Sequence, residues 1–125
     1  MPDNKKILIV EDDKFLAKML ARMLEERQLT VILAGTGKEG LTKAVSDQPD
    51  LILLDIMLPD SDGFDILRQL KEDDHTKKIP VVIISNLGQP EDVAQSKKLG
   101  AVDHLIKSDL ALDEVAAKVN QYLAT

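Results

Sequence analysis

The sequence predicts an α/β protein in which helices cover both faces of a parallel sheet. Short apolar runs recur along the 125-residue chain, and they are too short for helices and lack polar alternation, as is typical of strands buried on both faces. Longer segments with apolar residues at helical spacing lie between them, and this alternation of strand and helix indicates a parallel sheet. Five such units fill the chain, so we expect a single domain over residues 1–125.

The first two units can be placed by their boundary residues. A strand is expected at 7–10, followed by a helix with Asp13 as its N-cap. A second strand is expected at 30–34, followed by a helix of about ten residues that ends before Pro49. The residues of the first helix that are spaced to face the core are Phe15, Leu16, Met19, Leu20, Met23 and Leu24.

The remaining three units repeat this pattern, with strands expected at 51–54, 81–84 and 103–106. A turn from Pro59 to Gly63 leads into the third helix. Pro90 lies near the first turn of the fourth helix, and Gly100 ends it. The last helix is amphipathic, and its apolar face carries Leu112, Val115, Ala116, Val119 and Leu123.

Composition narrows the function classes. Aromatic residues make up 2% of the chain, which argues against stacking on nucleic-acid bases, and the net charge of -6 discourages binding to a phosphate backbone. The lack of cysteine excludes a disulfide, a thiolate metal site and a cysteine nucleophile. The first apolar run is too short for a secretory signal, and no run approaches membrane-spanning length. We therefore expect a soluble cytoplasmic protein that contacts neither membrane nor nucleic acid directly.

Four of the predicted strands end on reactive polar side chains, namely Glu11 and Asp12 after the first, Asp55 after the third, Ser85 after the fourth and Lys107 after the fifth. Right-handed crossovers require a doubly wound sheet to reverse its winding direction. In the strand order 2-1-3-4-5 the resulting crevice opens at the carboxyl ends of the first and third strands. The topology therefore gathers these residues into one site, although each alone has the simpler explanation of returning the chain to water.

The predicted site suits a divalent cation and a phosphoryl group. Three carboxylates at close range raise each other's pKa unless a cation joins them, and oxygen ligands in an open, hydrated cluster favour Mg²⁺, or Mn²⁺, over Ca²⁺. Asp55 is then the candidate nucleophile, which attacks phosphorus and keeps the group as an acyl phosphate. Lys107 would neutralise charge on the phosphoryl oxygens, and Ser85 would donate a hydrogen bond to them.

Taken together, the motifs resemble a known family. They are residues 7–13, which contain Glu11-Asp12-Asp13; residues 49–59, which contain Asp55; Asp62-Gly63; residues 80–85; and Gly100-Ala101 ahead of Lys107. The combination covers essentially the whole chain and is similar to the receiver domain of two-component response regulators, in a stand-alone form like the chemotaxis regulator. The resemblance implies a flavodoxin-like fold of five strands and five helices.

The resemblance also implies a signalling switch rather than an enzyme, one that catalyses only its own phosphoryl transfer and slow autodephosphorylation. Asp55 would receive the group from a histidine kinase or a phosphotransfer protein, Ser85 would follow it and Lys107 would pair with it. The surface of the fourth helix, fifth strand and fifth helix would then contact a downstream protein, with the chain a monomer or a phosphorylation-dependent dimer. The implied Mg²⁺ ligands are Asp12, Asp55 and the backbone carbonyl of Met57, with Glu11 acting through water.

Three departures from the family's usual pattern lie near the predicted site. Ser108 follows Lys107 where proline is usual, so this peptide bond is either trans or a strained cis bond, which costs a non-proline residue about 2.5–4 kcal/mol. His104 stands in place of the usual switch aromatic, and a half-buried ring beside the sheet is favoured over a pH-sensitive switch. Asn86 replaces a usually small residue, and would either narrow access to Asp55 or hydrogen-bond the phosphate.

Met57 and Leu87 occupy positions that flank the path of the hydrolytic water in receivers. Both are apolar, so we expect them to orient water poorly. The resulting hypothesis is that the phosphorylated form is comparatively long-lived.

Other interpretations explain less of the sequence. Residues 35–40 match the dinucleotide-binding pattern G-x-G-x-x-G, with Asp55 about 20 residues further on, but this pattern follows an edge strand and leaves the other strand ends unexplained. A P-loop fails because Leu41 replaces the required lysine, and a Ca²⁺ loop fails because Leu58 and Gln69 replace its first and last ligands. The remaining alternative is a receiver-like interaction module whose site is not phosphorylated.

Overall fold

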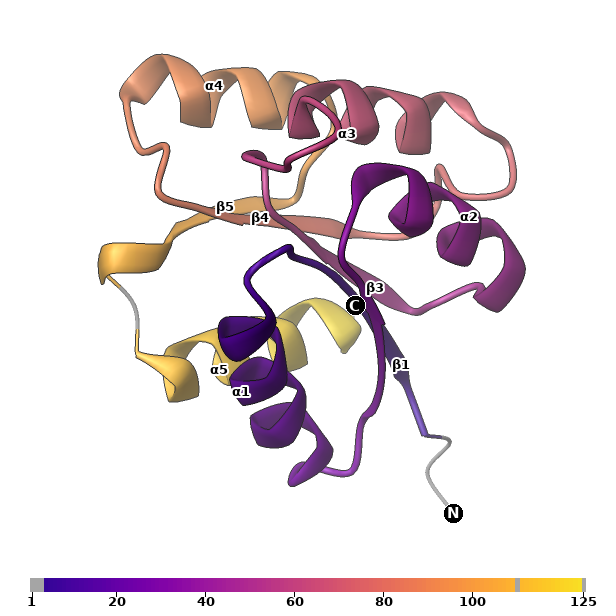
Figure 1. Ribbon diagram of the computed structural model, residues 1–125, viewed down its shortest axis with the longest axis vertical. Helices are drawn as coiled ribbons and strands as arrows, with labels where there is room; N and C mark the ends of the chain where they lie inside the picture. The colour runs from indigo at the N-terminus through magenta and orange to yellow at the C-terminus, as the bar shows by residue number, and fades with distance from the viewer. Residues whose placement is uncertain (1–3, 110, 125) are drawn as a thin grey trace.

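A computed structural model describes residues 4–109 and 111–124, and it contains five parallel strands in one sheet (Figure 1). The strands follow the order β2-β1-β3-β4-β5, which confirms the predicted topology. Because every neighbouring pair is parallel, all five carboxyl ends lie at the same edge of the sheet. The strands are β1 (Lys6–Val10), β2 (Thr30–Ala34), β3 (Leu51–Leu54), β4 (Val81–Ser85) and β5 (Asp103–Ile106).

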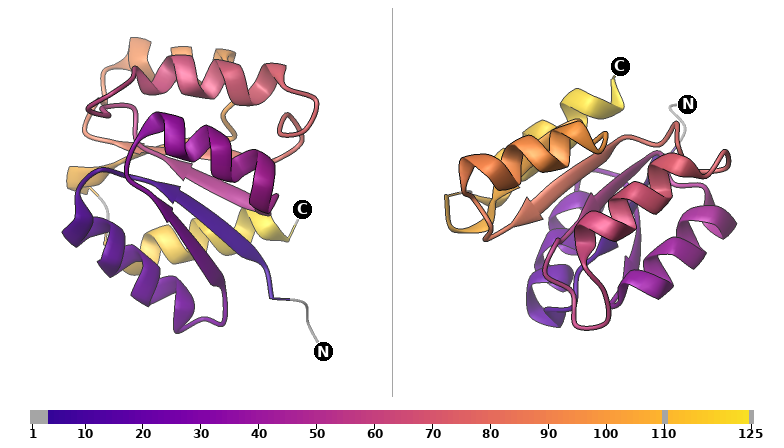
Figure 2. Two further views of the ribbon diagram at one scale, coloured as in Figure 1. Left: turned by 45° about the vertical axis from the view of Figure 1, so that its right-hand side comes forward. Right: turned by 90° about the horizontal axis from the view of Figure 1, so that it is seen from above.

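Helices cover the sheet in two layers. Figures 1 and 2 show α1 and α5 on one face and α2, α3 and α4 on the other. No helix within the described residues is long and apolar enough to cross a membrane. The helices are α1 (Lys14–Glu25), α2 (Gly37–Asp47), α3 (Gly63–Glu72), α4 (Pro90–Lys98) and α5 (Leu112–Leu123), with a short 3-10 helix, Lys107–Asp109, after β5.

The core fills both spaces between the sheet and its helices. Every residue of β3 and β4 is buried, and so is every residue of β1 from Ile7 onward. Successive side chains of a strand point to opposite faces, so Ile7 packs with α1 and α5 while Leu8 packs with α2 and α3. The predicted burial of these strands on both faces is therefore confirmed.

The prediction for the core-facing residues of α1 is wrong at two positions. Phe15 is 75% exposed and Met19 is 37% exposed, whereas Ala17 and Leu20 are buried. At about 100° per residue, Phe15 lies about 200° around the helix from Ala17, which places it on the solvent side, with Met19 at the margin of the buried stripe. Asp13 caps the helix as predicted, because its side chain accepts two backbone N–H groups of the first turn.

Gly63 lets α3 begin directly against the segment that follows β3. A Cβ at this position would lie 2.2 Å from the Cα of Ile56, so a larger residue requires the backbone to move. The N–H of Gly63 donates to the carbonyl of Ile56 at 2.8 Å, and the Asp62 side chain caps α3. These contacts fix the base of residues 55–62, which we call the β3–α3 loop.

Candidate functional site

The carboxyl edge of the sheet brings the predicted acidic residues together. Backbone hydrogen bonds continue past the strand ends, with the N–H of Asp55 donating to Val10 at 3.0 Å and the N–H of Glu11 donating to Ala34 at 2.9 Å. Asp55 and Glu11 are therefore held on adjacent chain segments, each rigidly tied to the sheet. Lys107 reaches both of them from the end of β5.

Three carboxylates form a cluster at this edge. Glu11, Asp12 and Asp55 each offer one oxygen, and these oxygens all lie within 4.8 Å of one another. Glu11 and Asp55 are buried and Asp12 is exposed, so the cluster opens to solvent on one side. An all-oxygen set of this kind, open to solvent on one side, fits a hard divalent cation.

Lys107 supplies positive charge beside the cluster. Its Nζ lies 2.9 Å from Asp55 Oδ2 and 2.7 Å from Glu11 Oε1. Burial opposes the charged form of Lys107, but the hydrogen bonds and opposite charges of Glu11 and Asp55 prevail and raise its pKa. For Glu11 burial prevails and raises the pKa of the carboxyl, despite the Lys107 ammonium and the N–H of Asp13.

The second Asp55 oxygen is held by the β3–α3 loop. Asp55 Oδ1 accepts the N–H of Met57 at 3.0 Å, and Met57 in turn pairs with Asp62 in an antiparallel bridge. Met57 is 58% exposed and lines a hollow of about 480 Å³ together with Asp12 and Leu87. The carboxylate of Asp55 is thus fixed through both oxygens beside an apolar, open surface.

Ser85 and His104 are connected through one residue, Leu87. The fully buried Ser85 accepts the N–H of Leu87 on its hydroxyl oxygen at 3.2 Å. The carbonyl of Leu87 lies 2.7 Å from Nε2 of His104. The other ring nitrogen, Nδ1, lies 2.9 Å from the hydroxyl of Ser96 on α4. The imidazole is buried rather than half-buried, and sequence reasoning missed both Leu87 and Ser96 as its partners.

The structure also places Ser108 and Asn86, two residues that depart from the usual receiver pattern. Every peptide bond in the described residues is trans, so Lys107–Ser108 is trans and the backbone enters the 3-10 helix at once. Asn86 is exposed at the end of β4.

The glycine-rich segment before α2 has a packing role. A Cβ on Gly40 would lie 2.8 Å from a methyl carbon of Val10, so the glycine allows α2 to approach the sheet closely. The N–H groups of Gly37 and Lys38 donate to the two carboxylate oxygens of Asp60, at 2.8 and 3.2 Å. A protein carboxylate thus occupies the position that a dinucleotide phosphate would need. Sequence reasoning treated Asp60 only as part of a turn.

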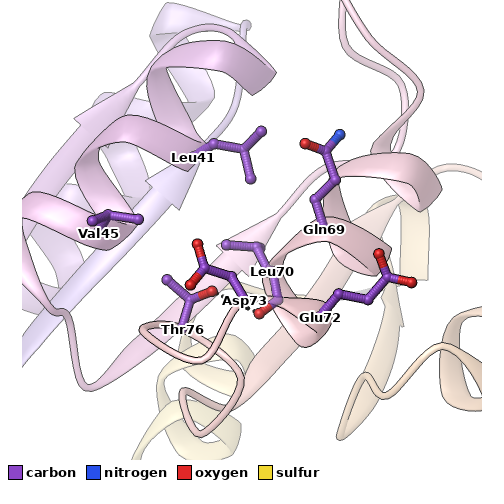
Figure 3. A pocket seen from close by; sticks show the side chains of 7 residues that line it. All are labelled: Leu41, Val45, Gln69, Leu70, Glu72, Asp73 and Thr76. Atoms are coloured by element: carbon purple, nitrogen blue, oxygen red, sulfur yellow. Dashed lines mark hydrogen bonds between the residues drawn. The ribbon is translucent and has the colours of Figure 1, made fainter.

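A separate hollow of about 330 Å³ lies between α2 and α3, away from the acidic cluster (Figure 3). The Thr76 hydroxyl donates to the carbonyl of Leu70 at 2.6 Å, and Asp73 accepts the N–H of His75 at 2.8 Å. These hydrogen bonds stabilise the turn after α3, and we therefore assign the polar residues of this hollow a structural role. Its lining residues are Leu41, Val45, Gln69, Leu70, Glu72, Asp73 and Thr76.

Comparison with known proteins gives a consistent result. A family model described as "Response regulator receiver domain" matches residues 7–120. The DNA-binding dual master transcriptional regulator RpaA of Synechocystis sp. is 39% identical over 118 residues, which cover 94% of this chain and 48% of RpaA. Protein PilH of Pseudomonas aeruginosa is 38% identical over 102 residues, which cover 82% of this chain and 84% of PilH. The chain spans about half the length of RpaA and of several other curated relatives.

Solved structures agree with the sequence matches. The receiver domain of the Francisella response regulator 1452 has a TM-score of 0.90 at 31% identity, over 97% of this chain and 98% of that chain. The BeF3-activated N-terminal receiver domain of RstA from Klebsiella pneumoniae has a TM-score of 0.89 at 28% identity, over 97% and 100% of the two chains.

Proposed function

The chain belongs to the response regulator receiver family, and on this premise we propose that residues 1–125 form a single phosphorylation switch whose acceptor is Asp55. Receiver domains of this family are signalling switches rather than enzymes. The phosphodonor is a histidine kinase or a phosphotransfer protein. An Asp55 oxygen attacks phosphorus, the P–N bond of the donor phosphohistidine breaks, the departing imidazole takes up a proton, and Asp55 keeps the group as an acyl phosphate.

The observation that carries the proposal is the fixed orientation of the Asp55 carboxylate. Its Oδ1 accepts the N–H of Met57 and its Oδ2 contacts Lys107. A nucleophile held in this way has already lost the rotational freedom that would otherwise raise the barrier to in-line attack. Lys107 also stabilises negative charge on the transferred group.

The carboxylate cluster would hold Mg²⁺ or Mn²⁺. Asp12, Asp55 and the backbone carbonyl of Met57 would be its ligands, and Glu11 would contribute through water. A bound divalent cation neutralises phosphoryl charge as the group approaches. The close approach of the three carboxylates, one of them exposed to solvent, supports this assignment.

Ser85 then responds to phosphorylation of Asp55. The added group carries a charge of about -1.5 to -2 at pH 7, which attracts the Ser85 hydroxyl and releases the N–H of Leu87. Because Leu87 also binds His104, the change reaches α4 and biases the surface formed by α4, β5 and α5 toward a binding-competent state. The partner at this surface is a downstream protein or a second copy of the chain, so the domain is a monomer or a phosphorylation-dependent dimer.

The proposed partners are proteins and not nucleic acid. The net charge of -6 opposes contact with a phosphate backbone, although the relative RpaA is named as DNA-binding. We also propose that the domain lies in the cytoplasm, together with its phosphodonor.

Mass spectrometry of the intact protein tests the proposal. Incubation with acetyl phosphate and Mg²⁺ is expected to add one phosphoryl group, and the addition should fail with a chelator and in Asp55→Asn. Asp74→Asn, at a solvent-exposed position, is the matched control and should be modified as fully as the wild type. No addition to the folded wild-type protein would instead favour an interaction module whose site is not phosphorylated.

A further inference from the structure

The tip of the β3–α3 loop is docked onto the first turn of α2. The Asp60 carboxylate accepts the N–H of Gly37 on Oδ1 at 2.8 Å and the N–H of Lys38 on Oδ2 at 3.2 Å. These partners are 23 and 22 residues away in sequence, so the contact joins two separate βα units. The helix has its own cap as well, because Thr36 Oγ1 accepts the N–H of Glu39 at 3.1 Å.

The packing around this contact depends on Gly37. A Cβ there would lie 2.8 Å from both Ser61 Oγ and Ile66 Cδ1, so the glycine allows the loop to approach α2 closely. The N–H of Gly37 is the largest influence on the Asp60 carboxyl and lowers its pKa. Asp60 is therefore an ionised carboxylate at a helix N-terminus, where the helix dipole favours negative charge.

The same loop carries part of the proposed cation site at its base. Met57 donates its N–H to Asp55 and pairs with Asp62. Residues 58–61 form the tip between these two bridge residues, and Asp60 is the contact that ties the tip to α2. The position of Met57 is thus determined by one anchor at the base of the loop and another at its tip.

We infer that Asp60 is a positioning residue for the cation site, acting through Met57 rather than by touching the cation. The inference rests on the proposed function, because the cation site belongs to that proposal. A loop fixed in advance loses less conformational freedom when its carbonyl binds the cation. Coupling of this kind is reciprocal, so cation binding must tighten the contact between Asp60 and α2.

Calorimetric titration of the unphosphorylated protein with Mg²⁺ tests whether Asp60 supports cation affinity. Asp60→Ala is expected to weaken Mg²⁺ affinity about 10-fold, within the range for residues that support a metal site from outside it. Asp60→Asn retains one acceptor oxygen and should fall between Asp60→Ala and the wild type. Circular dichroism establishes that each variant is folded.

Glu39→Ala is the matched control. Glu39 also accepts a backbone N–H at the start of α2, that of Gly35 at 2.7 Å, and it lines a hollow together with Glu11. Its removal therefore deletes a similar charge near the site without releasing the β3–α3 loop. Mg²⁺ affinity should stay within about two-fold of the wild type, whereas an equal loss in both variants would reduce the role of Asp60 to general electrostatics and overturn the inference.

Amide hydrogen exchange measured by NMR tests whether cation binding tightens the contact between Asp60 and α2. Exchange of the Gly37 and Lys38 N–H groups should slow when Mg²⁺ is added to the wild type, and this response should be lost in Asp55→Asn. If the wild type binds Mg²⁺ and these two amides do not respond, the inference fails while the proposed function stands. If the folded wild type binds no Mg²⁺, the proposed function itself fails.

Discussion

The ammonium of Lys107 lies 2.9 Å from Asp55 Oδ2, and it also reaches Glu11 Oε1 at 2.7 Å. One lysine therefore stands between two buried carboxylates that follow different strands. Its single positive charge offsets part of the negative charge of Glu11, Asp12 and Asp55 at the carboxyl edge of the sheet. The arrangement also places the positive charge where a phosphoryl group on Asp55 would carry its negative oxygens.

Loss of Lys107 should destabilise the fold. Lys107→Met is expected to lower the free energy of unfolding by about 3 kcal/mol at neutral pH without Mg²⁺, because it leaves two buried carboxylates uncompensated. Urea denaturation measures this loss, and added Mg²⁺ should restore part of it. Lys43→Met removes an exposed pair with Glu39 and should cost less than about 1 kcal/mol. Equal costs in the two variants would contradict this role of Lys107 in compensating buried charge.

Alkaline titration should report the contact between Tyr122 and Asp103. The Tyr122 hydroxyl donates to Asp103 Oδ2 at 2.7 Å, and this hydrogen bond raises the pKa of Tyr122 from 10.0 to about 12. The native state therefore keeps the phenol proton longer than the unfolded state does. The associated stability is fully present below about pH 10 and is lost as pH rises through the native pKa.

Phenolate absorbance measures this titration directly, because Tyr122 is the only tyrosine in the chain. Asp103→Asn should shift the midpoint toward the ordinary tyrosine value, while Asp113→Asn, on the exposed side of α5, should leave it unchanged. A wild-type midpoint at the ordinary value, in protein that circular dichroism shows to be folded, would count against the hydrogen bond.

His104 should stabilise the segment between β4 and α4. His104→Phe keeps a ring but removes partners of Leu87 and Ser96, so the free energy of unfolding should fall by about 1–3 kcal/mol. Hydrogen exchange should also rise across residues 86–96. The chain's other histidine, His75, is exposed, and His75→Phe should change stability by less than about 0.5 kcal/mol. Unchanged exchange in His104→Phe would rule out this role.

Met57 should set the lifetime of the phosphorylated form. Its apolar side chain lines the hollow beside Asp12 and offers no strong hydrogen bond to an attacking water. Met57→Asn is expected to speed hydrolysis of the acyl phosphate several-fold, as followed by the decay of the phosphorylated mass. Met19→Asn, on α1, is the control for adding an amide to the surface. Matching decay rates for wild type and Met57→Asn would refute the hypothesis.

The sequence predicted the fold and the meeting of the strand ends because both follow from local pattern and chain topology. Buried runs identify strands, and right-handed crossovers then determine which ends are neighbours. Contacts between distant turns were not predictable in this way. The pairing of Asp60 with Gly37 and that of His104 with Leu87 depend on how loops pack in three dimensions. Phe15 was misassigned because an apolar residue near a helix start can fall outside the buried stripe.

The burial of β1 and β3 on both faces has a consequence for how these strands align. A strand that is apolar on both sides carries no inside-outside signal, so a one-residue slip would bury the same kinds of side chain. A polar residue at the start of β3 supplies the missing signal. Asp50 exchanges two hydrogen bonds with the backbone of Lys6, at 2.8 and 2.7 Å, and its carboxylate accepts one of them. The Asp50 side chain therefore helps to hold β3 in the register that brings the Asp55 and Glu11 carboxylates together at the other end of the strand.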